Sequence, residues 1–169
     1  MSSLLIAIVG AVIGAVITAV AILYQTHAEV RRTKRSIAVG LFWEIDDFGR
    51  SHIQNTHRAL ERANPSELGY YVRTPYKGFT VYESTADRIG LFRPETVKAI
   101  VLFYGSARGY LNIVEDYAQA VEKVEAGQTH RNKAVTLLAL LKTVTAQMIP
   151  LISKVCELLE KEVGRKADD

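Results

Sequence analysis

The sequence is poor in the residues and motifs that most enzymes use. Its single cysteine, Cys156, allows no intramolecular disulfide and agrees with a reducing compartment. No nucleotide-binding glycine motif, GxSxG, HExxH or pair of cysteines with metal-ligand spacing occurs. Cys156 falls on an apolar helical pattern, where a buried and unreactive thiol is expected. We therefore expect no enzymatic activity, no catalytic residue, no metal and no cofactor.

The first 26 residues also lack charge: Asp, Glu, Lys, Arg and His are all absent between Met1 and Thr26. From Leu4 to Leu23, twelve of the twenty residues are Leu, Ile or Val. Twenty helical residues cover about 30 Å, the thickness of the hydrocarbon core of a bilayer. The run is too long for a signal peptide and no basic residue precedes it. The sequence predicts a retained transmembrane anchor over residues 1–25; a buried helix of a soluble domain is the alternative.

Positive charge is concentrated directly after this run. Residues 26–36 form a basic collar, which we expect to lie against lipid headgroups through Arg31, Arg32, Lys34 and Arg35. Residues 36–169 carry 17 basic and 17 acidic side chains, so the excess of +3 belongs to the collar and no specific nucleic-acid partner is expected. By the positive-inside rule, the N-terminus is predicted outside an inner membrane and the rest in the cytoplasm.

Small residues occupy one side of the predicted span, and bulky aliphatic residues the other. At about 100° per residue, one half of the helix presents Ala7, Gly10, Ala11, Gly14, Ala15 and Thr18. Gly10 and Gly14 form a GxxxG motif, which lets two helix backbones approach closely in lipid. This face predicts self-association in the membrane, although the residues involved are common in membrane spans.

The remainder reads as an all-α domain over residues 37–165, followed by a tail at 166–169. No strong helix breaker lies between Leu23 and Ala63, so the first helix is expected to continue into the cytoplasm. Its core-facing stripe comprises Ile37, Leu41, Ile45, Phe48 and His52. Asn64-Pro65-Ser66 is expected to end it. Ser84 to Asp87 resembles a helix start, with Gly90 as its stop.

Two further long helices follow. Pro94 suits a first helical position, and the heptad seam after it comprises Val97, Ile100, Tyr104, Ala107, Leu111, Val114, Ala118 and Val121. After a loop at 126–132, the last helix has a wide apolar stripe: Leu137, Leu138, Leu141, Val144, Met148, Leu151, Ile152, Val155, Leu158 and Leu159. Pro150 is expected to kink or break this helix. The sequence thus predicts an antiparallel bundle of about three long helices.

An aromatic-rich irregular segment is predicted at 67–82. Its aromatic residues are Tyr70, Tyr71, Tyr76, Phe79 and Tyr82. Tyr70 to Arg73 and Phe79 to Tyr82 are compatible with a short hairpin. The segment is interpreted either as an ordered loop packed across the bundle or as a surface that binds a soluble protein partner.

One arrangement resembles a catalytic motif. Arg50 and His57 form R-x6-H, which matches the R-x4-6-H pattern of HEPN-type ribonucleases. The chain has 12 Arg and four His in 169 residues, and the motif allows three spacings. About 0.85 such matches are therefore expected by chance, so the pair carries little information. His52 and His57 are five residues apart and point to different sides of a helix, whereas His57 and Glu61 are four apart and could meet on its surface.

In its overall plan the chain resembles small bacterial membrane-anchored helical proteins, including the membrane-pore accessory of type VI-B CRISPR systems. The resemblance lies in the span with Gly10 and Gly14, the collar from Arg31 to Arg35, the helical remainder and, weakly, Arg50 with His57. It implies an oligomer that perturbs the membrane during antiviral defence, and no site residue follows from it.

These patterns predict a non-enzymatic single-pass membrane protein that forms a homo-oligomer as a scaffold or pore-type accessory. The alternative is a monomeric membrane tether that recruits a soluble partner through the aromatic segment. A HEPN-like ribonuclease accessory is a minor alternative.

Overall fold

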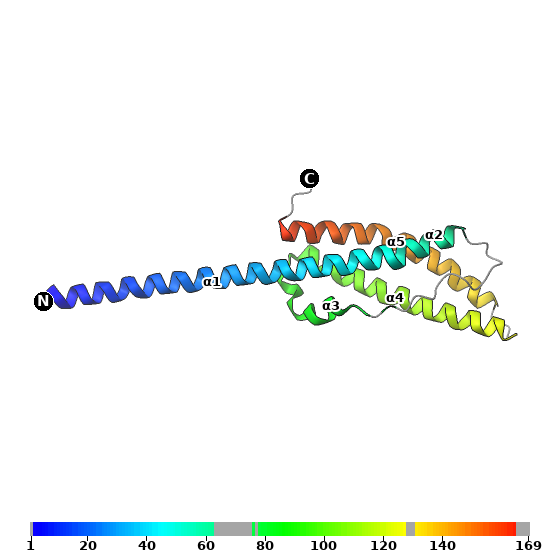
Figure 1. Cartoon of the computed structure of the whole chain (residues 1–169), viewed down its shortest axis with the longest axis horizontal. Coiled ribbons are helices and arrows are strands. Elements are labelled where there is room, and N and C mark those ends of the chain that lie inside the picture. The colour runs from blue at the N-terminus through cyan, green and yellow to red at the C-terminus, as the bar shows by residue number, and fades with distance from the viewer. Residues whose placement is uncertain (1, 63–75, 77, 128–130, 165–169) are drawn as a thin grey trace. The chain divides into compact units, whose positions relative to one another are not determined.

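The chain folds into helices. The computed structural model describes residues 2–62, 76, 78–127 and 131–164, with side chains from residue 14 onward, and those ranges contain no strand. The prediction of an all-α protein is confirmed. The elements in chain order (Figure 1) are α1 (Ser2–Phe48), the π-helix η1 (Gly49–Gln54), α2 (Asn55–Arg62), α3 (Thr80–Thr85), the 3-10 helix η2 (Ala86–Leu91), α4 (Pro94–Glu125) and α5 (Arg131–Val163).

The structure divides into two units, Met1–Ser36 and Ile37–Asp169. The first consists of the N-terminal part of α1, and the second holds the hydrophobic core. In the second unit, the predicted stripe on α1 is buried at Ile37, Leu41, Ile45 and Phe48, each 6% exposed or less. This part of the helix is therefore a core element, as its periodicity predicts.

Helices α4 and α5 supply most of the remaining core. Pro94 occupies the first turn of α4, as predicted. The predicted seam of α4 is buried at Ile100, Tyr104 and Ala107, but the helix also buries a second row comprising Phe103, Tyr110 and Tyr117. The second row was not predicted, and it exists because α4 packs against other elements on two sides. All ten predicted apolar positions of α5 are buried or half-buried.

The directions of the helices correct part of the predicted topology. Thr56 on α2 contacts Tyr110 and Glu44 on α1 contacts Tyr104, so α1 and α2 run in the same direction as α4. By contrast, His57 contacts Thr145, whereas the earlier Gly49 faces the later Ile152, so α5 runs in the opposite direction. The bundle is therefore only partly antiparallel: α5 is antiparallel to the other long helices, whereas α1 and α4 are parallel to each other (Figure 1).

The long first helix changes its winding at Gly49. A Cβ atom at this position would lie 2.9 Å from Ile152 Cγ2, so only glycine lets α5 approach here without displacement. The turns that follow form η1, and a π-helix of this kind is an insertion in an α-helix that shifts the faces of the residues beyond it. The absence of a strong breaker between Leu23 and Ala63 predicted a continuous α-helix here, so the π-helix differs from the prediction.

The segment before α4 also differs from the prediction. Phe79 to Tyr82 does not form a strand, because Phe79 precedes α3 and Thr80 to Tyr82 are helical. The helix therefore starts four residues before the predicted Ser84, and Ala86–Leu91 continues as a 3-10 helix. Tyr70 to Arg73, the other half of the predicted hairpin, lies outside the described residues.

Pro150 does not break the last helix, since α5 continues through it to Val163. Its side chain is exposed, so the ring requires no space in the core. Proline has no N–H, so the helix loses one backbone hydrogen bond at this position. The packing of Met148, Ile152 and Val155 in the core outweighs the free-energy cost of that lost bond.

Candidate membrane and assembly surfaces

The most prominent surface of the first unit is apolar. Every residue from Gly14 to Arg32 is exposed, and Val16, Ile17 and Val20 are 57 to 63% exposed. Water is a poor solvent for a continuous apolar surface of this kind, which in natural proteins marks a contact with lipid or with another protein chain.

The predicted small-residue face is open where the structure describes it. A Cβ atom added to Gly14 would have no heavy atom within 4 Å. The Thr18 hydroxyl donates to the Gly14 carbonyl oxygen at 2.8 Å, so this polar group is satisfied within the helix and is compatible with an apolar environment. Ala15 is exposed, whereas the side chains of Ala7, Gly10 and Ala11 lie outside the described residues.

The cationic collar follows this apolar surface. Arg31, Arg32 and Arg35 are exposed and Lys34 is half-buried. The apolar run ends at Tyr24, whose side chain is 77% exposed. Tyrosine is enriched where a span meets the headgroups, so Tyr24 belongs with the collar as a candidate interfacial residue. Tyr24 was not among the predicted site residues, although its place directly after the apolar run indicates this role.

Among the described residues, α5 is the helix whose length and composition would allow it to cross a membrane, with a mean hydropathy of 1.7 in its most apolar window. Core helices of soluble proteins share these properties. Leu141, Met148, Val155 and Leu159 on α5 are each no more than 1% exposed, so burial in the core accounts for much of the apolar character of this helix.

The described part of the aromatic segment packs inward. Phe79 is 2% exposed, so its assignment to a partner surface is wrong. Tyr76 and Tyr82 are half-buried, and Tyr82 stacks on Tyr104 with ring centroids 3.9 Å apart. Phe48 is the centre of the cluster, whose further rings are His52, Tyr76, Phe79, Phe103 and Tyr110. Tyr70 and Tyr71 lie outside the described residues.

Glu44 fixes this segment to the bundle. Its Oε1 accepts the Val81 N–H at 2.8 Å, and its Oε2 accepts the Tyr82 N–H at 3.1 Å and the Tyr104 hydroxyl at 2.7 Å. The two N–H groups belong to the first turn of α3, which has no side-chain cap of its own. Burial and the hydrogen bond to Glu44 raise the pKa of Tyr104, so its hydroxyl remains a donor. Sequence reasoning missed Glu44, because a single acidic residue on a helix gives no signal of a distant partner.

Arg50 and His57 have separate partners. Arg50 Nε pairs with Asp46 Oδ1 at 2.9 Å, and the Arg50 side chain is 71% exposed. His57 Nδ1 lies 3.1 Å from Thr145 Oγ1 and its Nε2 lies 3.5 Å from Glu61 Oε1, the helical pair whose spacing the sequence allows. His57 therefore links α2 to α5, whereas Arg50 makes an exposed pair within one helical segment.

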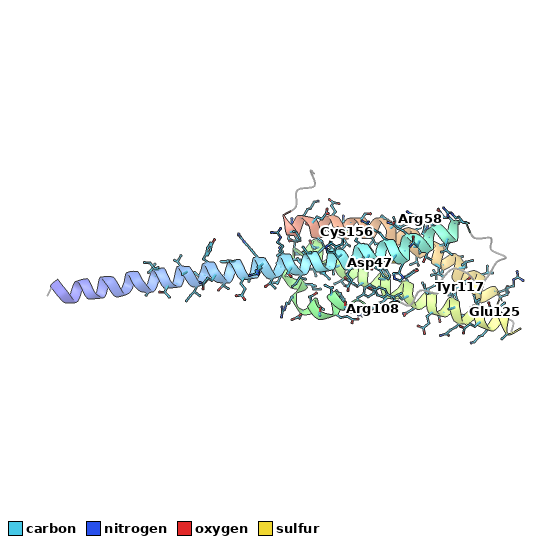
Figure 2. All side chains as sticks on the ribbon, in the orientation of Figure 1. Asp47, Arg58, Arg108, Tyr117, Glu125 and Cys156 are labelled. Carbon is cyan, nitrogen blue, oxygen red and sulfur yellow. The ribbon has the colours of Figure 1, made fainter. Side chains whose placement is uncertain are left out.

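The remaining candidate nucleophile among the described residues is Cys156. Cys156 is half-buried on α5 (Figure 2), and burial raises the pKa of its thiol to about 11, which disfavours the nucleophilic thiolate. No group of three His, Cys, Asp or Glu side chains is placed to hold a metal ion within the described part of the chain.

Comparison with known proteins gives no match: no protein-family profile, curated protein or solved structure resembles this chain significantly.

Proposed function

We propose that this protein is a non-enzymatic, single-pass membrane protein that self-associates through its N-terminal helix and presents a helical domain as a scaffold. In this proposal, residues 1–25 span the membrane and the N-terminus faces outside. The domain from Ile37 onward lies in the cytoplasm.

The observation that carries the proposal is the exposed apolar surface from Gly14 to Leu23. The described residues leave this surface uncovered, while Tyr24 and the cations from Arg31 to Arg35 follow in the order typical of a membrane boundary. A lipid environment removes the cost of exposing these aliphatic side chains to water, which is about 25 cal/mol per Å² of apolar area.

Self-association is supported by the open backbone at Gly14. Lipid tails are as apolar as leucine, so helices in a membrane gain little from hydrophobic burial and associate through close packing. With nothing within 4 Å of a Cβ atom at Gly14, a second helix has room to approach the backbone there. The same helix has bulky residues at Val16 and Val20, which keep a partner farther away.

The test is the mass of the full chain in mild detergent. Gly14→Ile adds bulk to the small-residue face, whereas Val16→Leu changes size on the bulky side and serves as the matched control. We expect Gly14→Ile to dissociate the oligomer and Val16→Leu to preserve it, with both proteins resisting alkaline extraction from membranes. Equal masses for wild type and both variants would contradict assembly through this face, and extraction of wild type at alkaline pH would contradict the anchor.

A further inference from the structure

We propose that the unit Ile37–Asp169 carries a second self-association contact, in which Trp43 on α1 of one copy packs against the outward face of α4 of the next copy. Two different surfaces meet in this contact, which makes it heterologous. It goes beyond the membrane contact proposed above. Only its parallel direction rests on the proposed anchor, which holds the Ile37 end of every copy toward the same bilayer.

Trp43, the single tryptophan of the chain, lies on the outer surface of α1. It is 61% exposed, although tryptophan is highly buried on average in folded proteins. Val39, one turn earlier on the same helix, is 39% exposed, so the two apolar side chains share one face. Tryptophan is enriched among the residues that contribute most to binding at protein interfaces, so this face is suited to a protein partner.

The outward face of α4 offers a second apolar surface. Val101 is 49% exposed and Leu102 is 55% exposed. A Cβ atom added to Gly105 would have nothing within 4 Å, so the backbone is bare beside these side chains. A hollow of about 570 Å³ opens next to them, and its lining includes Val97, Val101 and Leu102. A planar indole ring can approach such a surface closely and gain many dispersion contacts.

The two surfaces lie at similar distances from the end of the unit where α1 enters. Helices α1 and α4 run in the same direction, and a hydrogen bond of 2.7 Å from the Tyr104 hydroxyl to Glu44 aligns them. Trp43 directly precedes Glu44 in the sequence. Leu102 and Gly105 lie within two residues of Tyr104, which is about 3 Å along the helix axis. A copy that stands parallel to its neighbour can therefore bring α4 against Trp43 without a large shift along the axis.

Charged residues of opposite sign flank the two surfaces on matching sides. Asp47 is exposed on α1 one turn after the tryptophan, and the Arg108 side chain is 59% exposed on α4 (Figure 2). Arg108 Nη2 lies 3.4 Å from Glu83 Oε1 on α3. Burial raises the pKa of Tyr76, and the nearby charges of Asp47 and Glu83 add to this shift, so Asp47 also lies on the side of α3. Asp47 and Arg108 therefore flank α3 from α1 and from α4.

Charge favours the heterologous contact over a twofold one. When α1 of one copy meets α4 of a parallel copy, the edges of the two helices that face α3 meet as well, which places Asp47 beside Arg108. A twofold contact of parallel copies would bring each surface against itself, with Asp47 opposite Asp47 or Arg108 opposite Arg108. Like charges in such positions oppose association. The occupant of the α4 surface is therefore the Trp43 face of a second copy.

The first experiment measures association of the full chain in mild detergent over a range of protein concentrations. Every protein carries Gly14→Ile, which weakens the membrane contact. Trp43→Ala and Leu102→Ala should each raise the dissociation constant at least about tenfold, because each truncates one of the two apolar surfaces. Leu140→Ala truncates an exposed side chain of α5 and should associate as its parent does. A parent that stays monomeric at every concentration, or equal dissociation constants for the three variants, would overturn the proposal.

A mixing experiment in the same background tests whether the contact is heterologous. Trp43→Glu retains the α4 surface, and Leu102→Glu retains the Trp43 surface. Neither variant should associate alone, whereas their mixture should form a one-to-one complex that grows no further, because one intact contact remains. Absence of a complex between two variants with wild-type circular dichroism spectra would overturn the heterologous contact.

Cysteine cross-linking tests the direction in the full chain with Cys156→Ser. A mixture of Asp47→Cys and Arg108→Cys proteins should form the mixed disulfide in preference to either symmetric one. Asp47→Cys mixed with Lys98→Cys is the control, because an antiparallel contact of the same two surfaces would bring these positions together instead. Predominance of the control product, or of symmetric disulfides, would overturn the arrangement. Loss of this contact would leave the effect of Gly14→Ile on the otherwise wild-type chain unchanged, so failure of either proposal is distinguishable.

Discussion

Glu44 on α1 accepts a hydrogen bond of 2.7 Å from the hydroxyl of Tyr104 on α4, although 60 residues separate them. The same carboxylate accepts the backbone N–H groups of Val81 and Tyr82. One side chain thus joins three elements, and it supplies to α3 the cap that the sequence of α3 lacks. Gly40 allows the close contact beside it, since a Cβ atom there would lie 3.0 Å from Val81 Cγ1.

Removal of this carboxylate should destabilise the second unit more than removal of one of its partners. Tyr104→Phe loses one charge-assisted hydrogen bond, so we expect a loss of about 1.5 to 3 kcal/mol in the free energy of unfolding. Glu44→Ala should cost more, because it leaves the Tyr104 hydroxyl and two N–H groups without their acceptor. Denaturant unfolding followed by circular dichroism measures both, with the exposed Glu115→Ala as a control. A Glu44→Ala loss no larger than that of the control would contradict this role.

Two glycines in helical segments should respond to alanine in opposite ways. Gly49→Ala places a Cβ atom 2.9 Å from Ile152 Cγ2, and overpacking of this kind costs about 1 to 3 kcal/mol. Gly105→Ala meets nothing within 4 Å and should gain about 0.5 to 1 kcal/mol from the better helix propensity of alanine. The comparison is made by thermal unfolding of the two variants at low protein concentration. Stabilisation by Gly49→Ala would show that α5 does not need glycine at this contact.

These glycines illustrate what sequence patterns can and cannot predict. The 3.6-residue periodicity identified the buried stripe from Ile37 to Phe48 and the apolar positions of α5, because each of these faces packs against a neighbour along its length. The same periodicity could not predict that position 49 needs glycine, since this need comes from a contact with Ile152, which lies 103 positions away in the sequence.

The aromatic segment shows the other limit. Phe79, Tyr76 and Tyr82 were grouped correctly by composition, but composition gives no direction in which a ring points. Burial of Phe79 depends on Phe48 and Tyr104, and the helical start at Thr80 depends on Glu44, all of them distant in sequence. Local rules therefore allowed a strand at Phe79 to Tyr82, where tertiary contacts stabilise the start of a helix.

Acidification should weaken the second unit through His52. This imidazole stacks on Phe48 with ring centroids 5.2 Å apart, and burial lowers its pKa below 6.5, while the charge of Asp47 opposes part of the shift. Since the unfolded chain binds the proton at a higher pH than the folded chain, stability is greatest above pH 6.5 and falls as the pH decreases below it. Urea unfolding at pH 7.5 and 5.5 should show this loss.

Two histidine variants, one buried and one exposed, test whether His52 causes this pH effect. His52→Phe retains a ring on Phe48 without a titrating group, so we expect its stability to change less between the two pH values than that of wild type. His27→Gln, at an exposed position of the first unit, should keep the wild-type difference. If His52→Phe and wild type lose the same stability on acidification, other groups are responsible for the effect.

The cationic collar should determine the orientation of the chain in the membrane. Replacement of Arg31, Arg32, Lys34 and Arg35 by Gln removes four positive charges that lie directly after the proposed span. Because positive charge retains a flanking segment on the cytoplasmic side, the variant should insert in both orientations, whereas wild type should place its C-terminus in the cytoplasm. Reporter enzymes fused after Asp169, one active only in the cytoplasm and the other only in the periplasm, measure the ratio of orientations. Replacement of the exposed Lys98, Arg108, Lys142 and Lys154 by Gln removes the same charge far from the span and should leave that ratio unchanged. A wild-type C-terminus in the periplasm, or equal orientation ratios for the two quadruple variants, would contradict the role assigned to the collar.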